Sequence, residues 1–385
     1  MAWTDYDLGV IAAQRGDSEA ARTHLEAAGD NPRALYLLGR LTAEHDPGAA
    51  GPLYERAAVS GNADAAYSLG VIKANEGDYP AALEWYRRSA ELGDVDARRM
   101  VGLMYAIGQG VPVDNEAAVK HWRAAAAAGQ EQAVVDLGTL FTHHDVDVAE
   151  AAYWFLQAEG DAADRELARL AAPLQELAAT DDRARTMLGV LLAFRHGEPA
   201  RGAELLTASA DAGDPVAQRS LGFLVQHGKG LPADVDRAAV LYRAAAEGGD
   251  GIAAFNVGLL LGKAPEAVPW LRQAAESGIA EAYSVLGDRL SEQDLDDEAL
   301  RCYLRAAEGG HTGGMYAAAC WYRDGFGGPV DLVQALRWFL AMLGAGDGNG
   351  LHDARTVAAV LGADDIHEAG RLSGRLIEAD LLARG

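Results

Sequence analysis

Cysteine is scarce in this chain, and so are basic side chains and long apolar runs. Cys302 and Cys320 are the only cysteines among 385 residues, and both fall where the surrounding pattern predicts helix interior. We expect both to be reduced core thiols in a cytoplasmic protein. No stretch is long enough and apolar enough to span a bilayer. The first residues lack the basic start and apolar run of a signal peptide.

The shortage of basic residues argues against two classes of partner. Lys and Arg number 33 against 57 Asp and Glu, which gives a formal net charge of −24. Nucleic-acid binding requires clustered Lys and Arg, and docking on anionic membranes requires basic segments, so we predict neither. The acidity permits a basic partner, although abundant carboxylates also maintain solubility. Richness in Ala, Arg and acidic residues with few lysines is typical of a bacterium of high genomic GC content.

Motifs for catalysis and metal binding are also missing. The sequence has no Cys-x2-Cys, no His-Glu-x2-His and no Gly-x-Ser-x-Gly nucleophile elbow. The densest set of possible ligands is His143-His144-Asp145-Val146-Asp147, in an expected turn. Structural zinc sites usually draw on four spaced ligands, so the prediction here is a polar loop with Asp147 as a helix cap. We therefore predict no catalytic residues, no metal, no cofactor and no enzymatic activity.

What the sequence does contain is an internal repeat of about ten units. Each unit has a small anchor residue within an amphipathic stretch, then an aromatic residue or leucine and an alanine-rich stop about twenty residues later. Successive anchors are 30, 31, 32, 36, 51, 33, 36, 29 and 32 residues apart. The anchors are Gly9, Gly39, Gly70, Gly102, Gly138, Gly189, Gly222, Gly258, Gly287 and Ala319. This regularity predicts helical hairpins that stack on their neighbours.

The stretch 102–129, GLMYAIGQGVPVDNEAAVKHWRAAAAAG, indicates how one unit is built. Apolar residues at helical spacing precede Gly108 and Gly110, which can end a helix and bend the chain because glycine tolerates positive φ. Asp114 stands where an N-cap is expected, and Gly129 stops the second helix. A phosphate loop would need Gly-x4-Gly-Lys-Ser/Thr between a strand and a helix, so these glycines are interpreted as structural.

The stretches 97–129 and 217–250 resemble Sel1-like repeats, which are helical hairpins related to tetratricopeptide repeats. The first copy matches the family pattern at Ala97, Gly102, Tyr105, Gly108, Gly110, Val111, Asp114, Ala118, His121 and Gly129. The second matches it at Ala217, Leu221, Gly222, Gly228, Gly230, Asp234, Ala238, Leu241 and Gly248. The resemblance covers nearly the whole chain. It implies an all-α fold, a right-handed α-solenoid of about ten stacked helix–turn–helix repeats.

The single interval of 51 residues divides the array. An extra helical stretch is expected at 165–182, and further helices near 351–361 and 363–382. Trp154-Phe155 and Trp338-Phe339 resemble the segments that close an array in the family. We therefore predict two blocks of five hairpins, 1–182 and 183–385. A single solenoid with one insertion explains the same spacing equally well.

The side of the array that packing leaves uncovered is where we expect a partner. With the anchor as position 0 and 100° per residue, positions −5, −1 and +3 share one side of the first helix, and positions −6, −3, +1 and +4 lie roughly opposite. In tetratricopeptide-like arrays the first helices line the concave surface, where extended peptides bind. The candidate partner-binding residues at these positions, with position −2 at the edge, are Tyr6, Tyr36, Arg40, Tyr67, Arg99, Arg219, Phe223, Phe255, Asn256 and Tyr316.

These candidates favour a non-catalytic scaffold that binds a protein or peptide segment in the concave groove. Tyr and Arg combine contact area with hydrogen bonding, which suits recognition. Asn256 matches an Asn that tetratricopeptide relatives use to hold a peptide backbone. We predict partner contacts to Tyr36, Tyr67 and Arg99. Three alternatives stay open here: aromatic residues at −3 that only pack between hairpins, a structural subunit of a larger complex, and an accessory protein that binds a small molecule.

Overall fold

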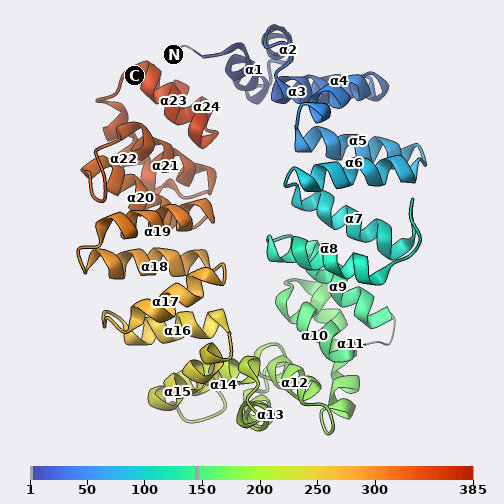
Figure 1. Cartoon of the computed structure of the whole chain (residues 1–385), viewed down its shortest axis with the longest axis vertical. Helices are drawn as coiled ribbons and strands as arrows, with labels where there is room; N and C mark the ends of the chain where they lie inside the picture. The colour runs from blue at the N-terminus through green and yellow to red at the C-terminus, as the bar shows by residue number, and fades with distance from the viewer. Residues whose placement is uncertain (1–2, 144–146, 385) are drawn as a thin grey trace. The chain divides into compact units, whose positions relative to one another are not determined.

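A computed structural model describes residues 3–143 and 147–384 of the chain. Its secondary structure consists of α-helices, numbered α1 to α24, and one short 3-10 helix, η1. No β-strand occurs within the described ranges, which confirms the all-α prediction (Figure 1). Helices that follow one another in sequence pack together as hairpins. The ten predicted repeats are all present as such pairs.

The chain separates into two compact units, one of residues 3–173 and one that begins at Leu174. The division falls inside α11 (Asp161–Leu177). The first unit contains the hairpins α1 (Asp5–Gln14) with α2 (Ser18–Ala27), α3 (Pro32–Ala43) with α4 (Pro47–Val59), α5 (Ala63–Asn75) with α6 (Tyr79–Glu91), α7 (Val95–Ile107) with α8 (Asn115–Ala127), and α9 (Glu131–His143) with α10 (Val148–Gln157).

The second unit also contains five hairpins, followed by shorter helices. They are α12 (Asp182–Phe194) with α13 (Pro199–Asp211), α14 (Pro215–His227) with α15 (Val235–Glu247), α16 (Gly251–Leu261) with α17 (Ala267–Glu276), α18 (Ala280–Ser291) with α19 (Asp296–Glu308), and α20 (Thr312–Asp324) with α21 (Leu332–Gly344). After them come η1 (Gly348–Gly350), α22 (Leu351–Ala358), α23 (Ala363–Ser373) and α24 (Leu376–Ala383).

Two expected boundaries were wrong. The extra helix expected at 165–182 is α11, which ends at Leu177, and α12 already begins at Asp182 with Asp181 as its N-cap. The helix expected at 363–382 is two helices, because Gly374 ends α23 in the left-handed conformation with φ 70°. A residue in that conformation cannot continue an α-helix.

Asp and Asn side chains start most of the helices. Asp94, the N-cap of α7, accepts a hydrogen bond from the Ala97 amide (2.9 Å), and Asp114 does the same for Ala117 in α8 (2.9 Å). Each such bond satisfies an amide that has no partner inside the helix. Other Asp N-caps are Asp17, Asp46, Asp78, Asp147, Asp181, Asp214, Asp234, Asp250 and Asp331. Part of the chain's acidity therefore serves helix formation.

The anchor glycines let a large side chain of the second helix lie against the first. A Cβ added at Gly102 would lie 2.6 Å from Cδ1 of Trp122, and one at Gly39 would lie 2.5 Å from Cε1 of Tyr54. The same holds for Gly9 and Leu25, Gly70 and Tyr86, Gly138 and Phe155, Gly189 and Leu206, Gly222 and Tyr242, Gly258 and Leu271, and Gly287 and Tyr303. The aromatic residue or leucine expected in each repeat thus packs on the anchor.

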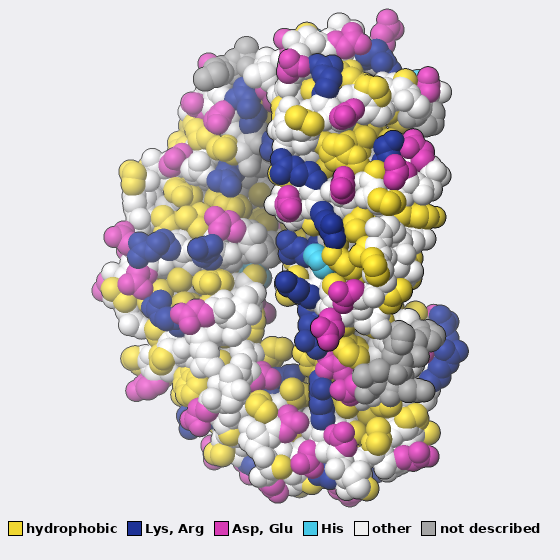
Figure 2. All heavy atoms as spheres, turned by 45° about the vertical axis from the view of Figure 1, so that its right-hand side comes forward, with side chains coloured by type: hydrophobic (Ala, Val, Ile, Leu, Met, Phe, Trp, Pro, Cys, Tyr) yellow, Lys and Arg dark blue, Asp and Glu magenta, His cyan; other side chains and the backbone are white. Residues whose placement is uncertain are grey.

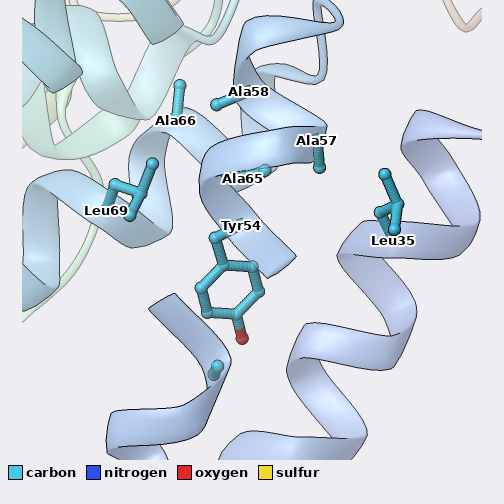
Figure 3. Packing of buried hydrophobic residues seen from close by; sticks show 8 residues of the cluster. Leu35, Tyr54, Ala57, Ala58, Ala65, Ala66 and Leu69 are labelled. Atoms are coloured by element: carbon cyan, nitrogen blue, oxygen red, sulfur yellow. The ribbon is translucent and has the colours of Figure 1, made fainter. Parts of the chain in front are cut away.

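Between hairpins the core consists largely of alanine with a few larger side chains. Around Tyr54 of α4, the residues Leu35, Ala57, Ala65, Ala66 and Leu69 form one buried cluster that draws on α3, α4 and α5 (Figure 3). Small residues allow the helices to approach closely, and tyrosine or leucine fills the remaining space at interior packing density. Each second helix therefore joins its own first helix to that of the next repeat.

The long glycine loops in three repeats dock on the preceding repeat. Gly108 ends α7 in the left-handed conformation (φ 71°), as predicted. Gly110 also has positive φ (74°), and a Cβ there would lie 2.5 Å from the carbonyl oxygen of Tyr79 at the start of α6. Gly230 approaches Ala200 of α13, and Gly327 approaches Asp296 of α19, in the same way. Both glycines of the pair are structural, and the second holds neighbouring repeats together.

Candidate functional site

Each first helix presents two different sides outside its packing contacts. We call first-helix face the surface formed by positions −6, −3, −2, +1, +4 and +5 of successive first helices. We call second-helix face the surface between successive second helices. Positions −4, −1 and +3 of the first helix lie at the bottom of this surface. In the fourth repeat, α7 packs against both α6 and α8. Tyr105 at position +3 lies between them, and Arg99 at −3 reaches α9.

The predicted tyrosines of the first unit lie on the first-helix face and are half-buried. The Tyr36 ring lies 5.9 Å from that of Tyr54, and the Tyr67 ring lies 5.4 Å from that of Tyr86, centroid to centroid. Burial raises the pKa of both Tyr36 and Tyr67, and nearby carboxylates add to this effect. Each ring therefore packs on the second helix of its own hairpin and stays partly exposed.

Tyr6 and Arg40 complete the predicted set at this end of the chain. Tyr6 is half-buried, and burial raises its pKa, while Arg33 of the next first helix acts in the opposite direction. Arg40 is exposed, and its charge acts on the hydroxyl of Tyr36. Residues at −3 thus face the start of the next first helix. Whether these residues form one binding row stays a prediction.

Arg99 has an ion-pair partner inside the protein. Its Nε donates to Oδ2 of Asp136 in α9 (2.6 Å), and its backbone carbonyl accepts a hydrogen bond from the Trp122 indole (3.0 Å). Arg219 in the second unit similarly donates to Asp250, the N-cap of α16 (2.8 Å). These pairs connect successive first helices. Arg99, for which a partner contact is predicted, thus already has a carboxylate beside it in Asp136.

In the second unit the first-helix face is more apolar. The rings of Phe194 and Phe223 lie 5.6 Å apart on α12 and α14, and Lys229 lies over the Phe223 ring (5.1 Å). Two side chains of α16 continue this surface: Ile252 is 50% exposed and Leu259 is 49% exposed. Exposed apolar side chains in neighbouring helices form a patch of the kind that marks interaction sites.

The remaining predicted residues of this unit differ in accessibility. Phe255 is only 8% exposed, so it belongs mainly to the core. Asn256 is half-buried between the Ile252 and Leu259 turns of α16, and within the described residues its amide has no hydrogen-bond partner. Tyr316 is exposed, with its ring 5.9 Å from that of Phe339. The partner-binding role of all ten residues stays a prediction.

The second-helix face contains a groove. Between α2 and α4 a hollow of about 410 Å³ has Leu35 and Leu38 of α3 as its floor and Arg22, Leu53 and Arg56 among its walls. Leu35 and Leu38 occupy positions −4 and −1 of their repeat, and Thr42 at position +3 also lines the hollow. The corresponding positions −4 and +3 of the fourth repeat carry Arg98 and Tyr105. The helical wheel, applied only to the first-helix face, did not single out this surface.

A basic cluster lies on the second-helix face of the fourth repeat. Arg87 of α6 donates from Nη2 to the Tyr105 hydroxyl (2.5 Å), with its guanidinium 5.5 Å from the ring centroid. The Tyr105 ring also stacks on His121 of α8 (5.8 Å between centroids, 16° between planes). Lys120 and Arg98 are the other cations that act on His121. Because these residues come from three helices, their proximity is visible only once the repeats are stacked.

Candidate sites for chemistry are few among the described residues. No group of three or more His, Cys, Asp or Glu side chains there could hold a metal ion. Residues 144–146 of the histidine-rich turn, and the His143 side chain, lie outside the described part. Asp147 caps α10, as predicted, by accepting from the Glu150 amide (2.8 Å). Cys302 and Cys320 are free thiols in α19 and α20, and burial raises the pKa of each. No helix in the described ranges is long and apolar enough to cross a membrane.

Comparison with known proteins gives relatives of two kinds. An uncharacterized protein of Neisseria meningitidis is 33% identical over 169 residues, 43% of this chain and 32% of that protein. The DAP3-binding cell death enhancer 1 of Rattus norvegicus is 28% identical over 218 residues, 52% of this chain and 43% of that protein. The chain thus spans less than half the length of these curated relatives.

Solved structures of related repeat proteins match over most of the chain. A protective antigen of uropathogenic Escherichia coli with an SLR fold is 22% identical, with a TM-score of 0.42, and the match covers 94% of this chain and 96% of that one. A Sel1 repeat protein from Oxalobacter formigenes is 24% identical, with a TM-score of 0.44, over 81% of this chain and 92% of that one.

The model of the Sel1 repeat matches seven segments that together make up more than half of the chain. They are residues 63–94, 95–130, 143–159, 215–250, 252–279, 286–311 and 313–347. The matched segments fall on α5–α8, α10 and α14–α21, and α9 lies between two of them. The first two hairpins and α12–α13 share the same anchor packing outside the matched segments. This chain belongs to the Sel1 repeat family.

Proposed function

We propose that this protein is a non-catalytic scaffold that binds an extended segment of a partner protein along the first-helix face. Repeats of this family generally mediate protein–protein interaction and generally act as scaffolds without catalytic activity. The observation that carries the proposal is the exposed apolar row on α12, α14 and α16, in which Ile252 and Leu259 flank Asn256 by about one helical turn on each side. Aromatic and aliphatic anchors around a few polar groups are typical of interaction surfaces.

Asn256 allows this row to form hydrogen bonds with a peptide backbone. A side-chain amide offers both donors and an acceptor, so it can pair with the N–H and C=O groups of one extended residue. Ile252 and Leu259 lie one turn away on either side and can exclude water from those hydrogen bonds. A hydrogen bond shielded in this way contributes more than one exposed to solvent. The resulting site favours an extended segment with apolar side chains.

A partner-capture experiment with matched variants tests the proposal. Ile252→Glu/Leu259→Glu places charge in the apolar row, and the control Val235→Glu/Val240→Glu places it on α15 of the same unit. The control valines are 53% and 64% exposed, so all four side chains are solvent-accessible and should tolerate the change. We expect the wild type and the control to retain the same proteins, identified by mass spectrometry, and Ile252→Glu/Leu259→Glu to lose them.

Equal recovery of the same proteins by both double variants, with unchanged melting curves, would contradict binding at this row. A stable complex of fixed stoichiometry that survives all the changes would instead favour a structural subunit. The predicted contacts in the first unit are tested with a separate variant. Because the Tyr67 ring packs on Tyr86, Tyr67→Phe with Arg99→Gln is preferable to truncation, since it removes hydroxyl and charge and keeps the ring. Loss of the partner in that variant would place the contact at Tyr67 and Arg99.

A further inference from the structure

We propose that the basic cluster of Arg87, Arg98 and Lys120, with Tyr105 and His121, docks an acidic segment of a partner protein, an extended peptide rich in Asp and Glu. The cluster lies on the second-helix face, between α6 and α8, with α7 as its floor. Arg99 and the other residues proposed to bind a partner lie on the first-helix face. The two surfaces are therefore separate, and neither proposal depends on the other.

The cluster is organised before any partner binds. The Tyr105 ring contacts the Arg87 guanidinium (5.5 Å from Cζ to the ring centroid) and stacks on the His121 imidazole. The Tyr105 hydroxyl accepts the hydrogen bond from Arg87 and so orients the guanidinium. Arg98 donates from Nη2 to the Ala90 carbonyl at the end of α6 (3.5 Å). Side chains that are already ordered lose less conformational entropy when they bind.

The charge of the cluster is not balanced within the described part of the chain. Arg87, Arg98 and Lys120 have no carboxylate within 4.0 Å there, although acidic residues far outnumber basic ones. Neighbours on the same helices differ: Arg88 pairs with Glu91 (3.7 Å), and Arg123 pairs with Glu150 (2.8 Å). Like charges held close together repel, and an anionic ligand relieves that repulsion.

The electrostatic surroundings of His121 show the same imbalance. Burial lowers the pKa of its imidazole, and the charges that lower it further are those of Lys120, Arg87 and Arg98. Among the described residues, the charged groups that shift this pKa are all cations. On the face that Figure 2 turns forward, several Lys and Arg side chains lie near a histidine, with Asp and Glu side chains among them. An anion bound among these cations would raise the pKa of His121, which provides a direct signal of occupancy.

The shape of the second-helix face suits an extended peptide. In the second repeat, Leu35 and Thr42 at positions −4 and +3 of the first helix line the groove between α2 and α4. In the fourth repeat Arg98 and Tyr105 occupy these positions, and Arg87 and His121 stand on the flanking helices. Arg guanidinium groups are planar forks that match carboxylates. A long nucleic-acid polyanion would extend beyond this cluster of three cations and be repelled by the net charge of −24.

The test uses the full chain and a short fluorescent peptide of alternating Glu and Ser, with an alternating Gln and Ser peptide as reference. Binding is measured by anisotropy at about 0.15 M salt, where the Debye length is about 8 Å and distant carboxylates are screened. The variant Arg87→Gln/Lys120→Gln is compared with Arg88→Gln/Lys73→Gln, which removes the same charge from side chains paired with Glu91 and Glu76.

We expect the Glu peptide to bind the wild type, and the first variant to bind it about three- to tenfold more weakly, as expected for the loss of two exposed ion pairs. The control and Ile252→Glu/Leu259→Glu should bind as the wild type does. In the wild type, the NMR titration of His121 should shift to higher pH when the peptide is present. That measurement needs no variant.

Several results would overturn the proposal. They are no binding of the Glu peptide, equal binding of the Gln peptide, equal weakening by the control variant, or an unchanged His121 titration at saturating peptide. A single-stranded DNA oligonucleotide is included as a third probe. If it binds more tightly than the Glu peptide and depends on Arg87 and Lys120, the cluster recognises phosphate, and the acidic-peptide assignment is wrong.

Discussion

At the scale of single residues, the anchor glycines are selected by the side chain that faces them. The Trp122 ring occupies the position where a Cβ at residue 102 would stand, and its indole N–H is committed to the carbonyl of Arg99. Glycine in a helix interior costs about 1 kcal/mol relative to alanine. Close contact with a large aromatic ring offsets that cost. A glycine is therefore needed at the anchor for the second helix to pack closely, which is why glycine recurs there in nearly every repeat.

Replacing an anchor glycine should destabilise the fold. Gly102→Leu and Gly222→Leu would force Trp122 or Tyr242 out of place, and overpacking of this kind typically costs about 1–3 kcal/mol. Gly51→Leu is the matched control, because Gly51 also lies within a helix, α4, and has no atom within 4 Å of the added Cβ. Urea unfolding measures all three. Equal stability of Gly102→Leu and Gly51→Leu would show that the packing role is wrong.

Buried tyrosines should make the fold sensitive to alkaline pH. Burial raises the pKa of Tyr86 to about 12, with Tyr67 as a smaller cause, whereas an unfolded tyrosine titrates near 10. A raised folded-state pKa gives stability that is full below pH 10 and is lost as the pH rises toward 12, because only the unfolded state releases its proton there. Tyr86→Phe should therefore lose less unfolding free energy than the wild type between pH 9 and about 11.5. Parallel losses in the two proteins would contradict this assignment.

At the scale of elements, the glycine loop connects one repeat to the next. Gly108 ends its helix, and Gly110 then passes against the carbonyl of Tyr79 at the start of α6. The same close approach occurs at Gly230 and Gly327. Repeats with this loop therefore gain a backbone contact to the preceding second helix in addition to the side-chain core.

Gly110→Ala should separate the two requirements on that glycine. An alanine at positive φ is strained by about 1–2 kcal/mol, and at Gly110 its Cβ would also collide with the Tyr79 backbone. Gly129→Ala carries only the strain, because Gly129 has φ 86° and open space around it. We expect Gly110→Ala to lower the melting temperature more than Gly129→Ala does. A larger decrease in melting temperature for Gly129→Ala would mean that the loop can move away from Tyr79 without loss of stability.

The elements could be predicted from the sequence where the signal is local. Asp114, Asp147 and Gly108 mark helix ends by their own side chains or their own φ, and all three act as expected. Gly374 carries the same kind of signal, but one glycine within a long amphipathic pattern is also compatible with a continuous helix. The expected helix 363–382 therefore proved to be two.

Contacts between repeats could not be predicted in the same way. The partner of Arg99 is 37 residues away in sequence, and the Arg87–Tyr105–His121 stack joins three helices. A helical wheel gives the side of one helix on which a residue lies. It does not give the rotation between repeats that decides which side chains meet. Phe255, expected on the binding face, is for this reason mostly covered by its neighbours.

At the scale of the whole molecule, net charge describes the partners poorly. Many of the carboxylates that produce the value of −24 cap helices, as Asp94 and Asp250 do, and also accept bonds from Ser89 or Arg219. These groups are used within the fold. The proposal for the cluster near Tyr105 therefore rests on how the remaining charges are distributed and not on their sum.

The two compact units should fold separately. In a solenoid each repeat contacts mainly its neighbours, so a fragment keeps most of its stabilising contacts. A cut after residue 179 leaves α11 whole and keeps the Asp181 N-cap with α12, whereas the expected boundary at 182 would remove that cap. This cut removes the hydrogen bond from Arg185 Nε to the Ala178 carbonyl (2.9 Å).

We expect fragments 1–179 and 180–385 each to show helical circular dichroism and a cooperative thermal transition. The Glu peptide should bind fragment 1–179 and not fragment 180–385. The partner that the Ile252→Glu/Leu259→Glu variant no longer binds should bind fragment 180–385. A fragment without cooperative unfolding would mean that its hairpins depend on the rest of the chain, and the prediction of two independent blocks would be wrong.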